Sequence, residues 1–129
     1  KQIDRIAREK IPLAVLMITN RSRALDPAVV RRASLHLRFH RPNAVQRRAV
    51  LAHLLEGTHP SEDQLAELVR ASEGLDGVPH SFSDLSVRLA RAALRRAFRD
   101  GRPFGAALLL QTLEEIEPSP LVEWEGRGG

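Results

Sequence analysis

Cysteine and tyrosine are absent from this 129-residue sequence, which also has a single tryptophan and a single methionine. The absence of cysteine excludes a disulfide framework, a thiol nucleophile and any zinc or iron–sulfur site with thiolate ligands. The longest apolar run, residues 13–18, is far shorter than the roughly 20 residues that cross a bilayer. The first ten residues are rich in charge, so no secretory signal is expected. These absences predict a soluble protein of the reducing cytoplasm that does not enter a membrane.

Lysine is also scarce. Lys1 and Lys10 are the only lysines beside 18 arginines, and neither follows a glycine-rich loop. A phosphate-binding loop of the G-x-x-x-x-G-K-[ST] type is therefore absent from this sequence. The 20 basic and 16 acidic residues give a net charge of +4, and 43% of the residues are hydrophobic. That composition is typical of a globular protein and argues against disorder.

The first 42 residues predict the end of an α/β domain. The unbroken apolar run at 13–18 is typical of a strand covered on both faces of a parallel sheet. Asp26-Pro27 predicts the start of a short helix, since Asp is a good N-cap and Pro suits the first helical position. The alternation over 35–40 predicts a half-exposed strand. Two strands do not make a sheet, so the remaining strands of the sheet must come from outside these residues.

From residue 43 the hydrophobic period becomes helical. Four helices are predicted, at about residues 43–55, 61–73, 82–98 and 104–117. The first has its apolar stripe at Val45, Ala49 and Ala52, and the second opens with a capping box at Ser61–Gln64. The predicted fold class is thus an α/β fragment, the last strands of a parallel sheet (of the P-loop type, as the family resemblance described next implies), followed by an all-α four-helix bundle. The predicted domains are residues 1–42, residues 43–118 and a flexible tail at 119–129.

Three motifs in order resemble the second half of the core of the AAA+ ATPases. They are Ile18-Thr19-Asn20-Arg21, then Ala24-Leu25-Asp26-Pro27-Ala28 leading to Arg31-Arg32, then the segment 35–42. The following helices resemble the helical lid of that family. The resemblance implies an ATPase that uses ATP and Mg²⁺, works as a ring of copies of itself and remodels a protein or protein complex. The phosphate-binding and magnesium-binding residues of such a protein would lie upstream, so this chain alone should not hydrolyse ATP.

The resemblance also implies roles for individual residues. Asn20, at the end of the first strand, would be the sensor that orients the attacking water, because a neutral amide does so without titrating. Arg31 or Arg32 would be the finger that stabilises charge on a neighbouring subunit's ATP, and the sequence does not say which of the two. Ser83 and Asp84, at the start of the third lid helix, would be nucleotide contacts or, alternatively, a helix cap.

A stripe of arginines runs along the third lid helix, at Arg88, Arg91, Arg95 and Arg99. The like charges of such a stripe repel one another unless acidic groups neutralise them. The neutralising groups are either the glutamates of the next helix together with solvent, or an anionic partner such as nucleic acid. The glutamates are Glu114, Glu115 and Glu117. Base stacking is not expected because tyrosine is absent and Trp124 lies in the tail.

Two other functions stay open on the sequence alone: a small basic helical module that binds DNA, and a non-hydrolysing adaptor that docks on an ATPase ring. A metal site is not expected. His36 and His40 share a strand face, but Arg38 stands between them where a carboxylate ligand would be needed.

Overall fold

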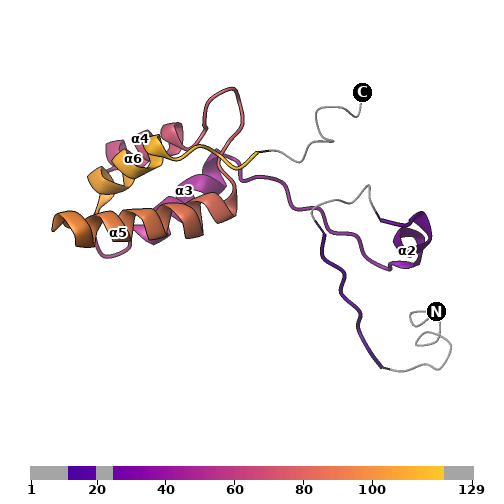
Figure 1. The fold of residues 1–129 in the computed structure, drawn as a ribbon. Coiled ribbons are helices and arrows are strands. Elements are labelled where there is room, and N and C mark those ends of the chain that lie inside the picture. Colours follow the sequence, from indigo (N-terminus) through magenta and orange to yellow (C-terminus); the bar gives the residue numbers. More distant parts are fainter. Residues whose placement is uncertain (1–11, 20–24, 121–129) are drawn as a thin grey trace. The chain divides into compact units, whose positions relative to one another are not determined.

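The computed structural model describes residues 12–19 and 25–120 and divides the chain into two units, Lys1–His36 and Leu37–Gly129. In the first unit the described residues contain one helix, α2 (Pro27–Arg32), which Figure 1 labels. The helix predicted after Asp26-Pro27 therefore forms, with Asp26 as its N-cap and Pro27 at its first position.

The expected strands do not form. Residues 12–19 and 35–40 have no regular secondary structure, and no strand occurs in the described residues, which are all-helical wherever they are regular. The predicted α/β fragment is therefore wrong for this structure. The physical reason is that a strand needs a neighbour for its backbone hydrogen bonds and a cover for its apolar side chains. No strand pairing occurs within residues 12–19 and 25–120, and the apolar side chains are uncovered: Ile18 and Phe39 are 88% and 90% exposed.

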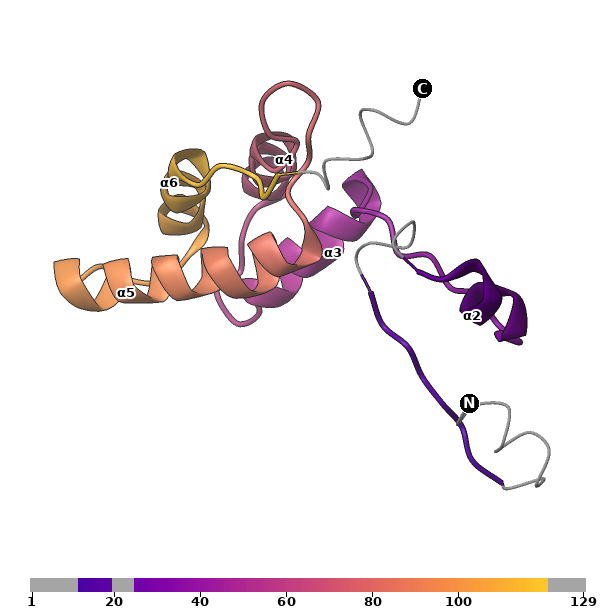
Figure 2. The same ribbon diagram turned by 45° about the vertical axis from the view of Figure 1, so that its right-hand side comes forward.

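The second unit is a helical bundle. It contains α3 (Ala44–Leu54), α4 (Glu62–Ala71), a π-helical segment η2 (Asp84–Leu89), α5 (Ala90–Asp100) and α6 (Ala106–Glu115). Segments η2 and α5 follow each other as one long rod, and α4 and α6 lie on the same side of it in Figures 1 and 2. Helix α3 contacts α4 and η2, and α6 contacts α4, η2 and α5. The four predicted lid helices are thus present as a closed bundle.

Local capping explains where these helices begin. Asn43 and Gln46 form a reciprocal capping box at the start of α3. Ser61 and Gln64 form another at the start of α4, and this second one is predicted by the sequence. Helix α5 ends at Gly101, whose φ of 61° lies in the left-handed region that glycine adopts without steric cost.

The core consists almost entirely of leucines. It comprises Leu51, Leu55, Leu65, Leu68, Leu85, Leu89, Leu109 and Leu113 with Ala93 and Ala106. The stripe predicted for the first lid helix is confirmed at Ala52, which packs against the core, and wrong at Val45 and Ala49, which are exposed. Helix α3 instead buries Leu51 and Arg47. Among residues 12–19 and 25–120, no helix has the length and apolar composition needed to cross a bilayer.

Candidate functional site

Helix α2 carries the two arginines that the sequence singles out. The Asp26 carboxylate accepts a hydrogen bond of 2.9 Å from the backbone N–H of Ala28, which fixes the start of the helix. Arg31 and Arg32 lie in the last turn, and both are exposed. Consecutive helical residues point about 100° apart, so the two guanidinium groups do not share a direction. The arrangement offers two cations at an exposed helix end, where the macrodipole favours positive charge.

The other predicted site residues lie outside α2. Asn20 lies outside the described residues, so its sensor role stays a prediction. Ser83 and Asp84 belong to the second unit, at the start of the rod η2–α5. Ser83 is exposed and makes no capping bond with its side chain. The cap is formed two residues earlier: the Ser81 hydroxyl accepts from Asp84 N–H at 3.0 Å, and Asp84 Oδ2 accepts from Ser81 N–H at 2.9 Å.

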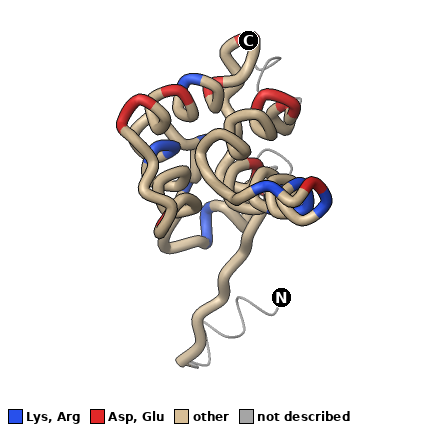
Figure 3. The backbone as a smooth tube through the Cα atoms, turned by 90° about the vertical axis from the view of Figure 1, so that its left-hand side faces the viewer, with Lys and Arg blue, Asp and Glu red and all other residues tan. Residues whose placement is uncertain are grey.

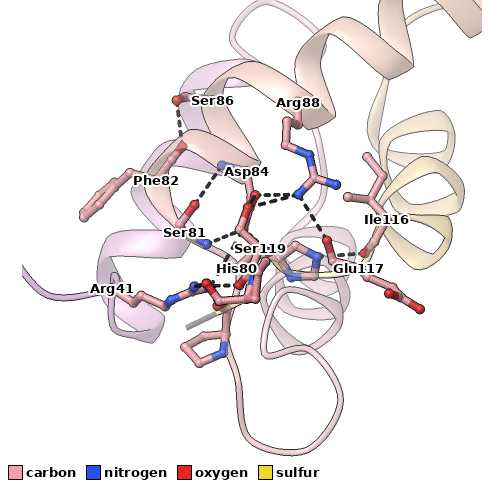
Figure 4. Close-up of polar contacts among 12 residues, drawn as sticks. Arg41, His80, Ser81, Phe82, Asp84, Ser86, Arg88, Ile116, Glu117 and Ser119 are labelled. Atoms are coloured by element: carbon pink, nitrogen blue, oxygen red, sulfur yellow. Dashed lines mark hydrogen bonds and ion pairs between the residues drawn. The ribbon is translucent and has the colours of Figure 1, made fainter. Parts of the chain in front are cut away.

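Asp84 is the centre of a buried polar cluster, drawn in Figure 4. Its side chain is fully buried, yet both carboxylate oxygens accept hydrogen bonds from the protein. Oδ1 accepts from Arg88 Nη1 at 2.6 Å and from the Ser119 hydroxyl, and Oδ2 accepts from the Ser119 backbone N–H at 2.9 Å. The cluster therefore joins the start of the rod to the segment that follows α6.

The electrostatics of Asp84 follow from these contacts. Burial raises the pKa of the Asp84 carboxyl, but the hydrogen bonds from the Ser119 hydroxyl and N–H, the Ser81 N–H and Arg88 outweigh it. The pKa is held well below its usual range, and Asp84 is charged at neutral pH. A buried carboxylate is tolerated in this position because every lone pair that faces the protein meets a donor.

Arg41 attaches the segment before α3 to the same cluster. Its Nη1 donates to the Pro79 carbonyl at 2.7 Å, and its Nη2 donates to the Ser119 carbonyl at 2.6 Å. Nη1 also lies 3.9 Å from Asp84 Oδ2. The planar fork of the guanidinium group suits this arrangement, because its donors reach two separate chain segments at once.

His80 and Arg88 hold the chain that leaves α6. The buried His80 ring places Nε2 2.9 Å from the Ile116 carbonyl and Nδ1 3.1 Å from the Ser72 carbonyl. Arg88 Nη1 donates to the Glu117 carbonyl at 3.2 Å. Residues 116–120 have no regular secondary structure, so these side chains supply the partners that their backbone carbonyls lack.

Acidic groups form ion pairs with only some arginines of the stripe on the η2–α5 rod. Arg88 pairs with Asp84, and Arg99 pairs with Asp100 at 2.8 Å. The glutamate contact from α6 goes instead to Arg96, which donates to Glu115 and lowers the pKa of that carboxyl. Arg91 and Arg95 have no hydrogen bond or ion pair within the described part of the chain.

No group of three or more His, Cys, Asp or Glu side chains that could hold a metal ion occurs within residues 12–19 and 25–120. His36 is instead engaged locally, with Nε2 donating to the Val30 carbonyl at 2.8 Å.

Sequence reasoning missed most of the Asp84 cluster. The Ser81-x-x-Asp84 spacing is a capping pattern that could have indicated the local part. Arg41 and Ser119 lie 78 positions apart, and no local pattern connects them. Arg47 was missed as a buried residue: it is 5% exposed, its Nε donates to Ser72 Oγ at 2.8 Å, and its Nη1 donates to the Pro42 carbonyl at 3.0 Å.

Comparison with known proteins gives clear relatives. A protein of Escherichia coli strain MS 115-1 named CD-NTase-associated protein 6 is 42% identical over an alignment of 125 positions that covers 92% of this chain and 38% of the relative. A protein of the same name from E. coli strain KTE188 is 33% identical over 111 residues, 85% of this chain and 37% of the relative. No protein-family model matches the chain.

Two solved structures also match this chain over more than nine tenths of its length. One, described as the structure of the E. coli MS115-1 HORMA:CdnC:Trip13 complex, matches 93% of this chain and 40% of its own with a TM-score of 0.83 and 39% identity. Another, of Rhizobiales Trip13, matches 92% of this chain and 44% of its own with a TM-score of 0.77 and 39% identity. The chain is therefore similar to Trip13, an AAA+ ATPase, which supports the resemblance that the sequence motifs carry. It spans about two fifths of the length of these relatives.

Proposed function

We propose that this chain is the C-terminal part of a Trip13-like AAA+ ATPase, in which residues 1–42 belong to the nucleotide-binding subdomain and residues 43–118 form the lid. The longer protein couples ATP binding and hydrolysis in a ring of identical subunits to remodelling of a protein partner. The observation that carries the proposal is the similarity to Trip13 over more than nine tenths of the chain at 39% identity. The complex that contains HORMA, CdnC and Trip13 supports a HORMA protein as the class of partner.

In this proposal Arg31 or Arg32 is the arginine finger. Phosphoryl transfer places growing negative charge on the γ-phosphate oxygens, and a guanidinium group brought in by a neighbouring subunit stabilises it. Both arginines lie in the last turn of α2 and are exposed to solvent. Asn20 is the proposed sensor, which orients the attacking water.

ATP and Mg²⁺ are the proposed cofactors of the longer protein. The phosphate-binding lysine and the magnesium ligands would come from residues outside this sequence, since it contains no P-loop. Of the two predicted lid contacts, the exposed hydroxyl of Ser83 suits a nucleotide contact. Asp84 suits it less, because its carboxylate is fully buried and already bonded to Ser81, Arg88 and Ser119. We therefore propose that Asp84 acts by holding the lid together.

The comparisons give no support to a nucleic-acid function.

The test is the ATPase rate of the full-length protein with Arg31→Ala, Arg32→Ala and both changes together. A finger contributes about 10³-fold or more to turnover, so one single variant should lose nearly all activity while ATP binding is kept. Arg70→Ala, which removes an exposed arginine from α4, is the matched control and should keep the wild-type rate. Wild-type turnover in the double variant would overturn the assignment.

A further inference from the structure

Helix α5 presents an outward face on which apolar and cationic side chains alternate. Phe98 is 87% exposed and Leu94 is 46% exposed, although most large apolar side chains of the bundle are in the leucine core. Together with Arg91, Arg95 and Arg99 they line a shallow, open hollow. These five residues are called the α5 face below. Exposing an aromatic ring to water costs free energy that only burial recovers, so this face is suited to contact with another molecule.

The described part of the chain does not supply enough acidic groups to neutralise the arginines of the α5 face. Arg91 and Arg95 are one turn apart and repel each other, and neither has an acidic partner in the described part of the chain. Figure 3 colours the positions of Lys and Arg along the backbone blue and those of Asp and Glu red. The carboxylates that approach α5, Asp100 and Glu115, are already bonded to Arg99 and Arg96. A ligand of this face must therefore bring its own negative charge.

A second observation points in the same direction. A smaller hollow between α5 and α6 shares Arg95 and Arg99 with the α5 face and is also lined by Arg96 and Glu115. Arg96 Nη1 is buried there without a hydrogen-bond acceptor. A buried guanidinium N–H that lacks an acceptor is destabilising. The edge of the α5 face that borders α6 thus offers three arginines and a single carboxylate, Glu115, which already pairs with Arg96.

We propose that the α5 face docks an acidic amphipathic segment of a partner protein. Apolar side chains of the segment would pack on Leu94 and Phe98, and flanking Glu or Asp carboxylates would pair with Arg91 and Arg95. Leu94 and Phe98 are one turn apart, about 6 Å along the axis, which matches apolar residues four apart on a partner helix. Aromatic and arginine side chains at the centre of a contact are the ones that carry most of its binding energy.

A protein segment suits this face better than nucleic acid does. A phosphate backbone would satisfy the arginines, but it would leave Leu94 and Phe98 exposed. Stacking of bases needs a series of aromatic side chains, and Phe98 is the only aromatic residue on α5.

The test measures fluorescence anisotropy of a labelled 16-residue peptide with Leu and Glu at helical i, i+4 spacing, titrated with the purified full-length protein. A second peptide with the same glutamates and Ser in place of every Leu is the control probe. The Leu/Glu peptide should bind about tenfold more tightly than the Ser/Glu peptide. Phe98→Ala and Arg95→Ala should each weaken its binding about tenfold, and Arg70→Ala on α4 should change it less than about twofold.

Three outcomes would overturn the proposal. Equal binding of the two peptides would show that charge alone acts. Tighter binding of a 12-nucleotide single-stranded DNA than of the Leu/Glu peptide, lost in Arg95→Ala, would assign the face to nucleic acid. Self-association in sedimentation equilibrium that Phe98→Ala abolishes would assign it to contact between copies of this chain. Phe98 and Arg95 lie outside the leucine core, so unchanged circular dichroism is expected for both variants.

Discussion

Ser119 donates twice to Asp84, once through its hydroxyl and once through its backbone N–H, across 35 positions of sequence. The same carboxylate caps the start of the η2–α5 rod through Ser81 and lies 3.9 Å from Arg41 Nη1. One buried charge therefore ties together the segment before α3, the beginning of the rod and the chain that leaves α6. If the bundle is the lid proposed above, such a cluster keeps those three segments from moving separately when the lid moves.

Replacing the carboxylate should test that cohesion. Asp84→Asn keeps the shape of the side chain but presents an amide NH₂ where one oxygen now accepts from protein donors, and it leaves Arg88 and Arg41 without their anion. We expect a loss of about 2 kcal/mol in the free energy of unfolding, measured by urea denaturation. Asp76→Asn is the control, since Asp76 is exposed and its φ of 59° suits Asn equally well. Equal stability of the two variants would mean that Asp84 does not hold the lid together.

The same carboxylate predicts a pH dependence. Because the folded state lowers the pKa of Asp84, its contribution to stability is present above the unfolded-state pKa of about 3.9 and is lost as pH falls through the folded-state pKa. The stability difference between wild type and Asp84→Asn should therefore be constant from pH 7 to about pH 5 and shrink below about pH 4. Urea denaturation at a series of pH values gives this difference directly. A gap that persists unchanged down to pH 2 would contradict the lowered pKa.

Two neighbouring arginines of α3 should respond very differently to removal. Arg47 is 5% exposed and donates to Ser72 and to the Pro42 carbonyl, whereas Arg48 pairs with Glu62 at the surface. Arg47→Ala leaves a cavity and unpaired buried acceptors, so we expect a loss of about 3 kcal/mol in the free energy of unfolding. Arg48→Ala should lose less than about 0.5 kcal/mol, the usual value of a surface ion pair. Thermal denaturation of both variants separates the two cases, and similar melting temperatures would contradict the buried role of Arg47.

A pair of glycines in the loop between α4 and the rod offers a matched test of the backbone. Gly74 and Gly77 have φ of 71° and 74°, so alanine is strained at both. A Cβ on Gly74 would also lie 2.1 Å from the Val78 carbonyl oxygen, whereas one on Gly77 meets nothing within 4 Å. Gly77→Ala should lose about 1 kcal/mol of unfolding free energy, and Gly74→Ala at least about 2 kcal/mol more. Losses of equal size would mean that the loop relaxes away from the clash.

The sequence predicted those features that depend on neighbours along the chain. The capping box at Ser61 and the helix start at Asp26-Pro27 need only a few adjacent residues, and the structure confirms them. The strands at 13–18 and 35–40 were wrong because a strand is completed by other strands, which the described residues do not supply. The buried face of α3 was also wrong, since the packing of Arg47 against Ser72 comes from the position of α4 and not from the hydrophobic pattern of α3.

The candidate site divides in the same way. The helix that presents Arg31 and Arg32 could be predicted, because Asp26 and Pro27 specify its start locally. The joining of Arg41, Asp84 and Ser119 could not, because it depends on how three distant segments fold against one another. The roles of Asn20, Arg31 and Arg32 in catalysis stay predictions, since they require a nucleotide and a second subunit.

The last prediction concerns whether the arginines act across a subunit interface. In the proposed ring, Asn20 acts on the ATP of its own subunit, whereas Arg31 or Arg32 acts on the ATP of the neighbour. Full-length Asn20→Ala and the double variant Arg31→Ala/Arg32→Ala should each be nearly inactive alone. Mixed subunits, however, create interfaces at which an intact Asn20 meets intact arginines. An equal mixture should therefore recover about a quarter of the wild-type ATPase rate per subunit, because about one interface in four is then complete.

That activity can be interpreted only for rings that contain both variants. The mixture is therefore prepared by co-refolding or co-expression with two different affinity tags, and mixed rings are purified through both tags. An equal mixture of Asn20→Ala with wild type is the matched control. Its activity should scale with the fraction of intact sites. If doubly purified mixed rings of the two inactive variants hydrolyse no more ATP than either variant alone, Arg31 and Arg32 do not act on a neighbour's nucleotide. A ring of one variant alone lacks either Asn20 or the arginines at every interface. Recovered activity therefore indicates that the arginines of one subunit complete the site of its neighbour.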